Sequence, residues 1–169
     1  MAHWLVKSEP DVFGIGELQR KGTAPWDGVR NYQARNFLRA MAVGDRCIFY
    51  HSNAEPSGAA GICTVARAHY PDHTAWDPAS PYHDPKDGPQ VQRWSMVDMR
   101  FELVFARFLP LAELRAVPEL SGMLLFSASR LSVQPVEDAH FALIEAMGGG
   151  QPPAARRSGS SRRASGRGR

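Results

Sequence analysis

The chain has 169 residues, 43% of them apolar, which is enough to bury one hydrophobic core and fits a single domain. It contains no apolar run long enough to cross a bilayer, and its first ten residues lack the apolar core of a secretion signal. We therefore expect neither membrane association nor secretion. Cys47 and Cys63 lie in apolar runs, where buried, reduced thiols are expected rather than a disulfide.

The net charge of +3 is unevenly distributed along the chain. Residues 148–169 contain six arginines and no acidic residue, which leaves 14 basic against 17 acidic residues, a net charge of −3, in the preceding part. Any nucleic-acid affinity of that part must come from a local basic patch. We expect one domain over residues 1–147 and a disordered Arg/Ser/Gly-rich tail over residues 148–169, which either attracts phosphates without sequence preference or only solubilises the chain.

Strand and helix signals alternate in the first half of the chain. Asn31 is a suitable N-cap for a helix whose apolar residues follow at helical spacing and whose end is expected at Gly44. The other elements predicted here are a strand stopped by Pro10, a short helix and two further strands, over residues 3–7, 15–21, 46–51 and 60–69.

The second half begins with a segment that has no regular pattern. Residues 71–90 hold five prolines, two aromatic residues and four aspartates, and a connection of this length is usually functional or disordered. The prolines can stiffen it without making it a strand. The elements expected after it are a long central strand, a short helix, a last strand and a last helix, over residues 92–105, 111–117, 130–133 and 136–147. This order predicts an α+β fold in which short helices flank a curved, barrel-like sheet.

The segment Trp26–Arg39 carries the strongest functional signal. Trp26 precedes an Asp27-Gly28 turn, Asn31 follows as a helix cap, and three arginines come from the same region. An aromatic ring beside a turn can stack on a base, and a cationic helix next to it can hold a phosphate. The alternative is that Trp26 closes the end of the core, that Arg30 pairs with Asp27, and that the other two arginines are solvated. The predicted phosphate ligands are Arg30, Arg35 and Arg39.

Polar residues at the ends of predicted strands are further candidates. Lys7, Ser8 and Glu9 end the first predicted strand, and Tyr50, His51 and Ser52 end the second. Tyr82 lies between prolines that could aim its ring, with Trp76 as the alternative, and Trp94 is expected in the core. Arg130 and Ser132 alternate with apolar residues and would share one strand face with Gln134, facing either water or a ligand.

Signals for catalysis are weaker. A hydrolase or nucleotide-modifying enzyme could use His51 with Glu9 or Asp84, but no Gly-x-Ser-x-Gly elbow supports such a site. His69 and His73 have a helical spacing that Pro71 interrupts, so no metal site is expected. No phosphate-binding glycine loop is present, and no cofactor is expected.

Several motifs resemble the EVE domain, a member of the PUA-like group of nucleic-acid-binding folds. They occur in the family's order, and the segments that carry the resemblance are residues 4–10, 26–39, 49–52, 82–86, 93–98 and 130–135. The resemblance implies a binding module rather than an enzyme. Its partner would be nucleic acid with a modified base, either a methylated or oxidised cytosine in DNA or a modified base in RNA.

The resemblance also implies an aromatic pocket that receives a flipped base. Trp26 and Tyr82 would form its walls, Lys7–Glu9 would lie at its mouth, and the face of Arg130 and Ser132 would point toward it. The remaining predicted ligand-binding residues are Asp27, Asn31, Tyr50, His51 and Ser52. Such a protein is expected in the cytoplasm, or in the nucleus if its source is eukaryotic.

Overall fold

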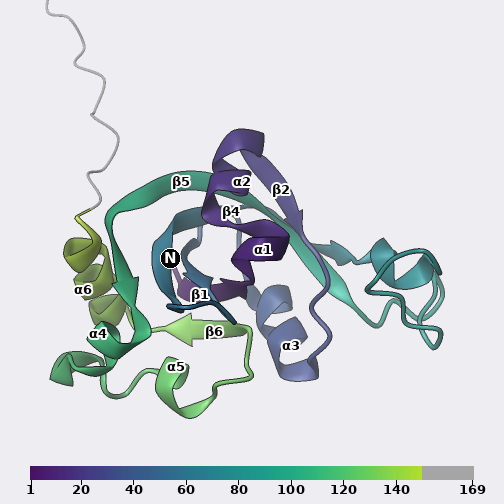
Figure 1. Cartoon of the computed structure of the whole chain (residues 1–169). Helices are drawn as coiled ribbons and strands as arrows, with labels where there is room; N and C mark the ends of the chain where they lie inside the picture. The colour runs from purple at the N-terminus through teal and green to yellow at the C-terminus, as the bar shows by residue number, and fades with distance from the viewer. Residues whose placement is uncertain (150–169) are drawn as a thin grey trace, which may run out of the picture.

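A six-stranded sheet forms the centre of the molecule (Figure 1), a computed structural model in which residues 1–149 are described. The strand order is β2-β5-β4-β3-β1-β6, so β2 and β6 are the two edges. The sheet curves strongly but stays open over residues 1–149, and short helices flank it. The predicted α+β class and the curved sheet are thereby confirmed. Apart from Gly148 and Gly149, the predicted tail lies outside the described residues.

Only one pair of neighbouring strands is parallel. β1 runs parallel to β3, and all other neighbours are antiparallel. β4 and β5 are long and their register shifts several times, which lets the sheet bend. The strand bounds are β1 His3–Ser8, β2 Thr23–Trp26, β3 Arg46–His51, β4 Gly58–Pro71, β5 Ser95–Pro110 and β6 Val133–Val136.

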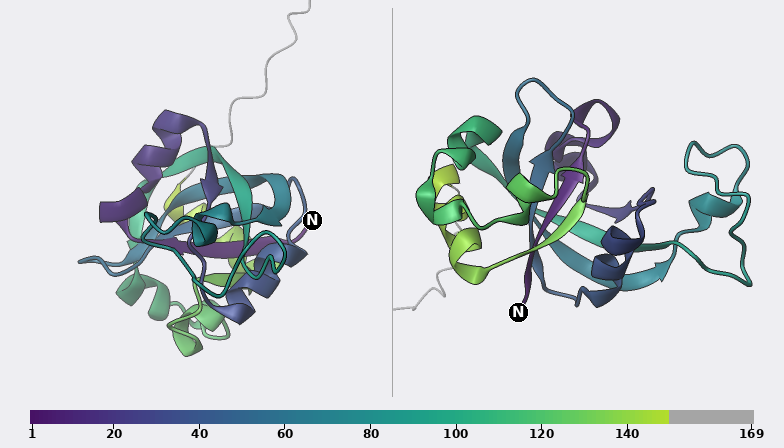
Figure 2. Two further views of the ribbon diagram at one scale, coloured as in Figure 1. Left: turned by 90° about the vertical axis from the view of Figure 1, so that its right-hand side faces the viewer. Right: turned by 90° about the horizontal axis from the view of Figure 1, so that it is seen from below.

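Short helices surround the sheet. In Figure 1 and in the right-hand view of Figure 2, α4 and α6 lie at one end of the molecule, while α3 lies toward the other end, where the loop over residues 72–94 projects outward. The loop includes a 3-10 helix, His73–Trp76. A second 3-10 helix, Pro118–Leu120, follows α4. The α-helix bounds are α1 Pro10–Phe13, α2 Ile15–Lys21, α3 Tyr32–Ala40, α4 Leu111–Arg115, α5 Leu124–Ser127 and α6 Asp138–Gly148.

Both faces of the sheet are buried. Trp4 and Val6 of β1 pack in one core cluster with Phe49, while Leu5 between them packs in a second cluster with Ile48. This alternation follows from the period of two along a strand. The first cluster contains residues of α2 and α3, and the second contains residues of α4, α5 and α6. None of the helices in residues 1–149 has the length and apolar character needed to cross a bilayer.

Most sequence-based elements are confirmed, and three differ. α3 ends at Ala40, and Gly44 (φ 93°) lies instead in the turn that leads to β3. The last strand is shifted from residues 130–133 to Val133–Val136. Gln134 does not share an exposed face with Arg130, because its buried amide donates to the carbonyls of Ala128 and Leu131. The third difference is that β2, which pairs with β5, and the short helices α1 and α5 were not expected from the sequence.

Candidate nucleic-acid interface

Two of the predicted motifs meet at the ends of parallel strands. Lys7 lies opposite Tyr50 and Ser8 opposite His51 in the β1–β3 pairing. The backbone N–H of Ser52 donates to the Ser8 carbonyl at 3.0 Å, which continues the contact beyond the strands. Because parallel strands end at the same edge of a sheet, these motifs are brought side by side, but the predicted ligand residue Tyr50 is buried in the core.

The segment before β6 joins the same edge. The Lys7 backbone N–H donates to the Ser132 carbonyl at 2.9 Å, and the Lys7 ammonium donates to the Ser129 carbonyl at 2.9 Å. Burial lowers the pKa of Lys7. Ser132 is therefore brought to the strand ends as expected, while the Arg130 side chain is exposed to solvent. Lys7 holds the 129–132 segment against β1.

Ser8 and Glu9 already have partners within the protein. The Ser8 hydroxyl donates to the Phe13 carbonyl at 2.6 Å, which ties the end of β1 to α1. The Glu9 carboxylate accepts from the Asn53 side-chain amide at 3.2 Å. A carboxylate accepts several hydrogen bonds, so Glu9 keeps acceptor capacity for a ligand.

His51 is held as a neutral acceptor. Its Nε2 accepts from the backbone N–H of Ile15 at 3.2 Å, an assignment that puts the ring proton on Nδ1. Burial lowers the pKa of His51, which also favours the neutral ring. Its ring lies between Phe49 and Phe108, with centroid distances of 5.5 and 6.1 Å. The lone pair that a general base would use is therefore already engaged.

The acidic partners considered for catalysis do not reach His51. Glu9 is bonded to Asn53, and Asp84 accepts from the Trp94 indole N–H at 2.7 Å and from the Lys86 backbone at 3.0 Å. Over residues 1–149, no group of three His, Cys, Asp or Glu side chains is placed to hold a metal ion. The arrangement does not assemble the acid–base pair of the alternative interpretation.

Trp26 is part of the core, contrary to the expected partly exposed ring in a turn. It is the last residue of β2, opposite Val97 of β5, and is only 6% exposed. Its ring meets Phe49 and Phe13 edge-on, at centroid distances of 5.3 and 6.2 Å. Pairing of β2 with β5 directs the side chain inward, and the Asp27-Gly28 turn begins only after it. The structure therefore agrees with the alternative interpretation, in which Trp26 closes the end of the core.

Gly28 and Tyr82 are in direct contact. Gly28 has a φ of 77°, and a Cβ added to it would lie 2.7 Å from the Tyr82 ring. Only glycine combines this left-handed backbone with such a close approach. The ring of Tyr82 therefore packs against the turn, which brings the long loop to the predicted motif. Asn31 caps α3 as expected, because its Oδ1 accepts from the Ala34 N–H at 2.9 Å.

Arg30 fastens the long loop to the turn. Its guanidinium donates to Asp72 at 2.9 Å, to the Tyr82 carbonyl at 2.8 and 3.0 Å, and to Val29 and Thr74. All five N–H groups have acceptors in the protein. The alternative Arg30–Asp27 pair is replaced by Arg30–Asp72, and this geometry does not support the prediction of Arg30 as a phosphate ligand. Its partner lies 42 residues away, beyond what local spacing reveals.

Asp72 is the buried centre of this contact and was not identified as a site residue. It has no exposed side-chain surface and also accepts from the Gly28 N–H at 2.9 Å. Burial opposes its ionisation, but hydrogen bonds from Thr74, Gly28 and Arg30 outweigh that effect and lower the pKa of Asp72. Asp72 therefore stays charged and holds the turn and the loop together.

The charges of two predicted ligand-binding residues, Asp27 and Glu9, act on a third, Tyr82 of the docked loop. Burial raises the pKa of the Tyr82 hydroxyl, and the charges of Asp27 and Glu9 raise it further. Burial and the charge of Asp72 likewise raise the pKa of Asp27. Glu9 from the end of β1 thus lies within electrostatic reach of the turn and the loop. We call Glu9, Asp27 and Tyr82 the polar cluster.

The outer face of α3 presents a different surface. Tyr32 is 53% exposed and stacks on Trp94 at 4.9 Å, and the Arg35 guanidinium lies 4.8 Å above Tyr32. Trp94 is buried, as expected. Arg35 also donates to the Arg93 carbonyl at 3.0 Å, and Arg39 donates to the Ser95 hydroxyl at 2.9 Å. Neither Arg35 nor Arg39 has an ion pair with a carboxylate among the described residues.

Comparison with known proteins gives the family. The model of the EVE domain matches residues 2–147, and the chain belongs to the EVE domain family. The chain is 43% identical to human thymocyte nuclear protein 1 over 162 residues, which cover 85% of this chain and 72% of the relative.

Solved structures agree with the family and the fold. A protein from Leishmania major superposes with a TM-score of 0.86 at 48% identity, covering 88% of this chain and 94% of the other. Human THYN1 protein, solved in complex with 5-methylcytosine containing DNA, superposes with a TM-score of 0.85 at 40% identity, covering 90% of this chain and 100% of the other. The predicted family and the PUA-like fold are confirmed.

Proposed function

We propose that this domain reads 5-methylcytosine in DNA, with the base flipped toward the polar cluster of Glu9, Asp27 and Tyr82. The observation that carries the proposal is the similarity, over nine-tenths of this chain, to a protein solved with DNA that contains 5-methylcytosine. The same ligand would place the protein in the nucleus of a eukaryote, as the name of the human relative suggests, or in the cytoplasm of a bacterium.

The chemistry of the cluster suits a cytosine. Cytosine presents an exocyclic amino group, and carboxylates of Asp and Glu are its usual acceptors. Asp27 and Glu9 supply two carboxylates, and Tyr82 supplies an aromatic face with a hydroxyl. Backbone groups at the ends of β1 and β3, around Ser8 and Ser52, provide further donors and acceptors along the same edge. Trp26 would support this site from the core rather than stack on the base.

Binding without turnover is the second part of the proposal. Two observations support it: the Nε2 lone pair of His51 is engaged by Ile15, and neither Glu9 nor Asp84 contacts the ring. The protein should leave labelled methylated DNA unchanged, as measured by mass analysis after long incubation with and without divalent metal. A product whose formation requires His51 would favour the enzyme instead.

The binding proposal is tested by titrating the full chain with matched duplexes. Fluorescence anisotropy would compare duplexes with one central cytosine, 5-methylcytosine or 5-hydroxymethylcytosine, together with single-stranded RNA of the same sequence. We expect a preference for the methylated duplex of about tenfold, since one well-read base contributes roughly 1–3 kcal/mol. Equal affinity for all duplexes, or tighter binding of a modified RNA, would contradict the DNA assignment.

Variants then locate the reading site. Asp27→Asn and Tyr82→Phe should each reduce the preference for the methylated duplex, while Asp77→Asn, an exposed residue of the same loop, should leave it unchanged. Circular dichroism would confirm that each variant is folded. A preserved preference in both cluster variants would remove the polar cluster from the site.

A further inference from the structure

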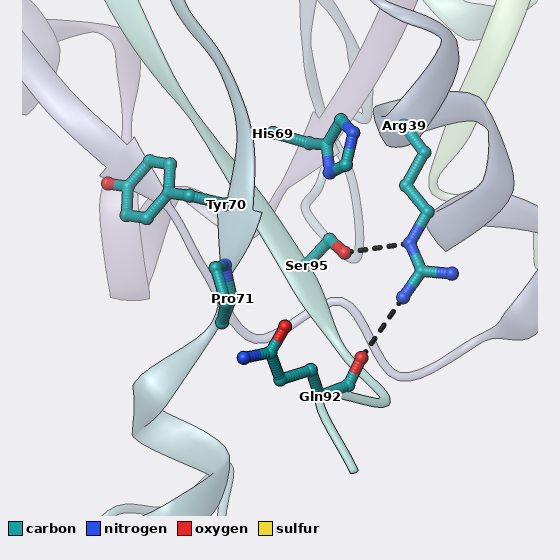
Figure 3. Close-up of a pocket in the computed structure, with 6 residues that line it drawn as sticks. All are labelled: Arg39, His69, Tyr70, Pro71, Gln92 and Ser95. Atoms are coloured by element: carbon teal, nitrogen blue, oxygen red, sulfur yellow. Dashed lines mark hydrogen bonds between the residues drawn. The ribbon is translucent and has the colours of Figure 1, made fainter. Parts of the chain in front are cut away.

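A pocket of about 310 Å³ lies beside α3 (Figure 3). Residues from α3, the end of β4 and the start of β5 line it: Arg39, His69, Tyr70, Pro71, Gln92 and Ser95. Figure 3 shows the guanidinium of Arg39 and the imidazole of His69 at its rim, with the Gln92 side chain below them. A cation, an imidazole and an amide around one small cavity are groups that bind an anion.

Arg39 is held in place by neutral acceptors only. Its Nε donates to the Ser95 hydroxyl at 2.9 Å, and its Nη2 donates to the carbonyls of Gln92 and Arg93 at 3.1 and 3.3 Å. Its Nη1 has no acceptor within the part of the chain that the structure describes. Ser95 is buried, so it fixes the direction of the guanidinium without neutralising its charge.

The positive charge of Arg39 is therefore uncompensated. Burial and the charge of Arg35, one helical turn earlier, both lower the pKa of Arg39. Arg46 shows the opposite arrangement, because it donates to Glu102 and Glu145 at 2.7 and 2.8 Å. An anion bound between α3 and residue 92 would offset the repulsion between Arg35 and Arg39. At Arg46 the two carboxylates already supply the compensating charge.

Residues 92 and 93 add to this geometry. Gln92 has a φ of 50°, which is uncommon for a residue other than glycine, and its carbonyl is held by Arg39. The strained backbone turns the chain from the projecting loop into β5 at the edge of the pocket. Such strain persists where surrounding contacts determine it, often at ligand sites.

We propose that this pocket binds a phosphate of the DNA backbone, as a second contact separate from the polar cluster. The inference rests on the proposed function, because it assigns the anion to the same DNA strand. Arg39 lies about two turns along α3 from Asn31, roughly 12 Å at ~1.5 Å per residue. In this proposal α3 runs along the duplex axis, on which successive nucleotides of one strand advance ~3.4 Å, so the bound phosphate lies about three or four nucleotides from the flipped base.

The first test measures salt dependence with the full chain. Affinity for the methylated duplex would be measured by anisotropy at several salt concentrations for the wild type, Arg39→Gln and Arg107→Gln. Arg107 is an exposed arginine of β5, paired with Glu113, so its replacement changes the net charge equally. We expect Arg39→Gln to lower affinity about tenfold and the salt slope by about 0.9, with methyl preference retained. Arg107→Gln should change the affinity and the salt slope much less than Arg39→Gln does.

The second test needs no change in the protein. Phosphates of the methylated duplex would be replaced one at a time by neutral methylphosphonates. For the wild type, we expect one sensitive position about three or four nucleotides from the methylcytosine, in addition to any next to it. Arg39→Gln should be insensitive at that position only. This scan stays informative even if Arg39→Gln folds poorly, because the wild-type profile alone shows whether a distant phosphate is held.

The possible outcomes separate the two proposals. An unchanged salt slope in Arg39→Gln, together with no sensitive distant phosphate, would overturn the phosphate pocket and leave base reading intact. Loss of methyl preference in Arg39→Gln with an unchanged slope would also overturn it, because Arg39 would then act on the base. If the wild type shows no methyl preference but the slope and the scan behave as expected, base reading fails and the phosphate pocket stands.

Discussion

The two halves of the segment 26–39 relate to the rest of the protein in opposite ways. In the first half, Trp26 is buried against Phe49, and Arg30 donates to Asp72 and to the Tyr82 carbonyl of the long loop. In the second half, Tyr32 is exposed, and Arg39 contacts only neutral groups. One short motif thus contains a structural clamp followed by a charged surface.

The difference shows that residue type alone does not identify a contact with nucleic acid. Arg30 and Arg39 carry the same guanidinium group, but a buried carboxylate compensates one of them and none among residues 1–149 compensates the other. A guanidinium already paired with a buried carboxylate has little to gain from a phosphate. The guanidinium that remains available for a phosphate is that of Arg39, which donates only to hydroxyl and carbonyl oxygens.

Replacing Trp26 should have the largest effect. Trp26→Ala should lower the free energy of unfolding by about 3–5 kcal/mol, because it leaves a large cavity against Phe13 and Phe49. Urea denaturation would measure the loss, and Trp26→Phe, which refills much of the space, should lose clearly less. Near wild-type stability of Trp26→Ala would contradict the assignment of Trp26 to the core and, with it, the contrast between the two halves of the segment.

Removing the buried carboxylate of Asp72 should come next. Asp72→Asn should destabilise the fold by about 3 kcal/mol, because the Arg30 charge loses its partner and buried donors lose their acceptor. It should also weaken the methyl preference, since Tyr82 would no longer be held against Gly28. Asp77→Asn in the same loop is the control for both measurements. Wild-type stability in Asp72→Asn would show that the clamp is not structural.

Local signals in this segment were predictable, and long-range contacts were not. The N-cap at Asn31 follows from its own side chain and the next turn of helix, and the structure confirms it. The burial of Trp26 depends on β2, a four-residue strand that contains Pro25 and forms only against β5. For Arg30 the sequence suggested a phosphate or, as the alternative, the nearby Asp27, whereas its partner comes from the distant loop.

The strand-end motifs illustrate the same limit. Lys7–Glu9 and Tyr50–Ser52 were each identified from polar residues that follow apolar runs. Their meeting at one edge requires the parallel pairing of β1 with β3, which no local pattern encodes. Arg39 was predicted as a phosphate ligand, but the pocket beside it was not, because its walls come from α3, β4, β5 and residue 92. Only the two arginines at helical spacing hinted at it.

His51 should give a smaller, pH-dependent effect on stability. Its pKa is lowered by burial in the folded protein, so the unfolded chain binds this proton at a higher pH than the native one. Stability should therefore fall as the pH drops below about 6.5, the ordinary pKa of histidine. His51→Gln, which keeps an acceptor for the Ile15 N–H, should reduce this loss. Thermal unfolding between pH 8 and pH 5 would measure the stability of both proteins. An equal loss of stability in the wild type and in His51→Gln would contradict this prediction.

Replacing Tyr32 should have the smallest effect and gives the sharpest contrast with Trp26. The ring is half exposed, and its main contacts are the stack on Trp94 and the guanidinium of Arg35. Tyr32→Ala should therefore cost only about 1 kcal/mol of stability, the usual contribution of one aromatic pair. A double-mutant cycle with Trp94→Phe would isolate that pair from the loss of buried area. In DNA titrations we expect weaker binding with an unchanged methyl preference, because Tyr32 lies on the charged surface beyond the polar cluster. A stability loss comparable to that of Trp26→Ala would show that both halves of the segment belong to the core.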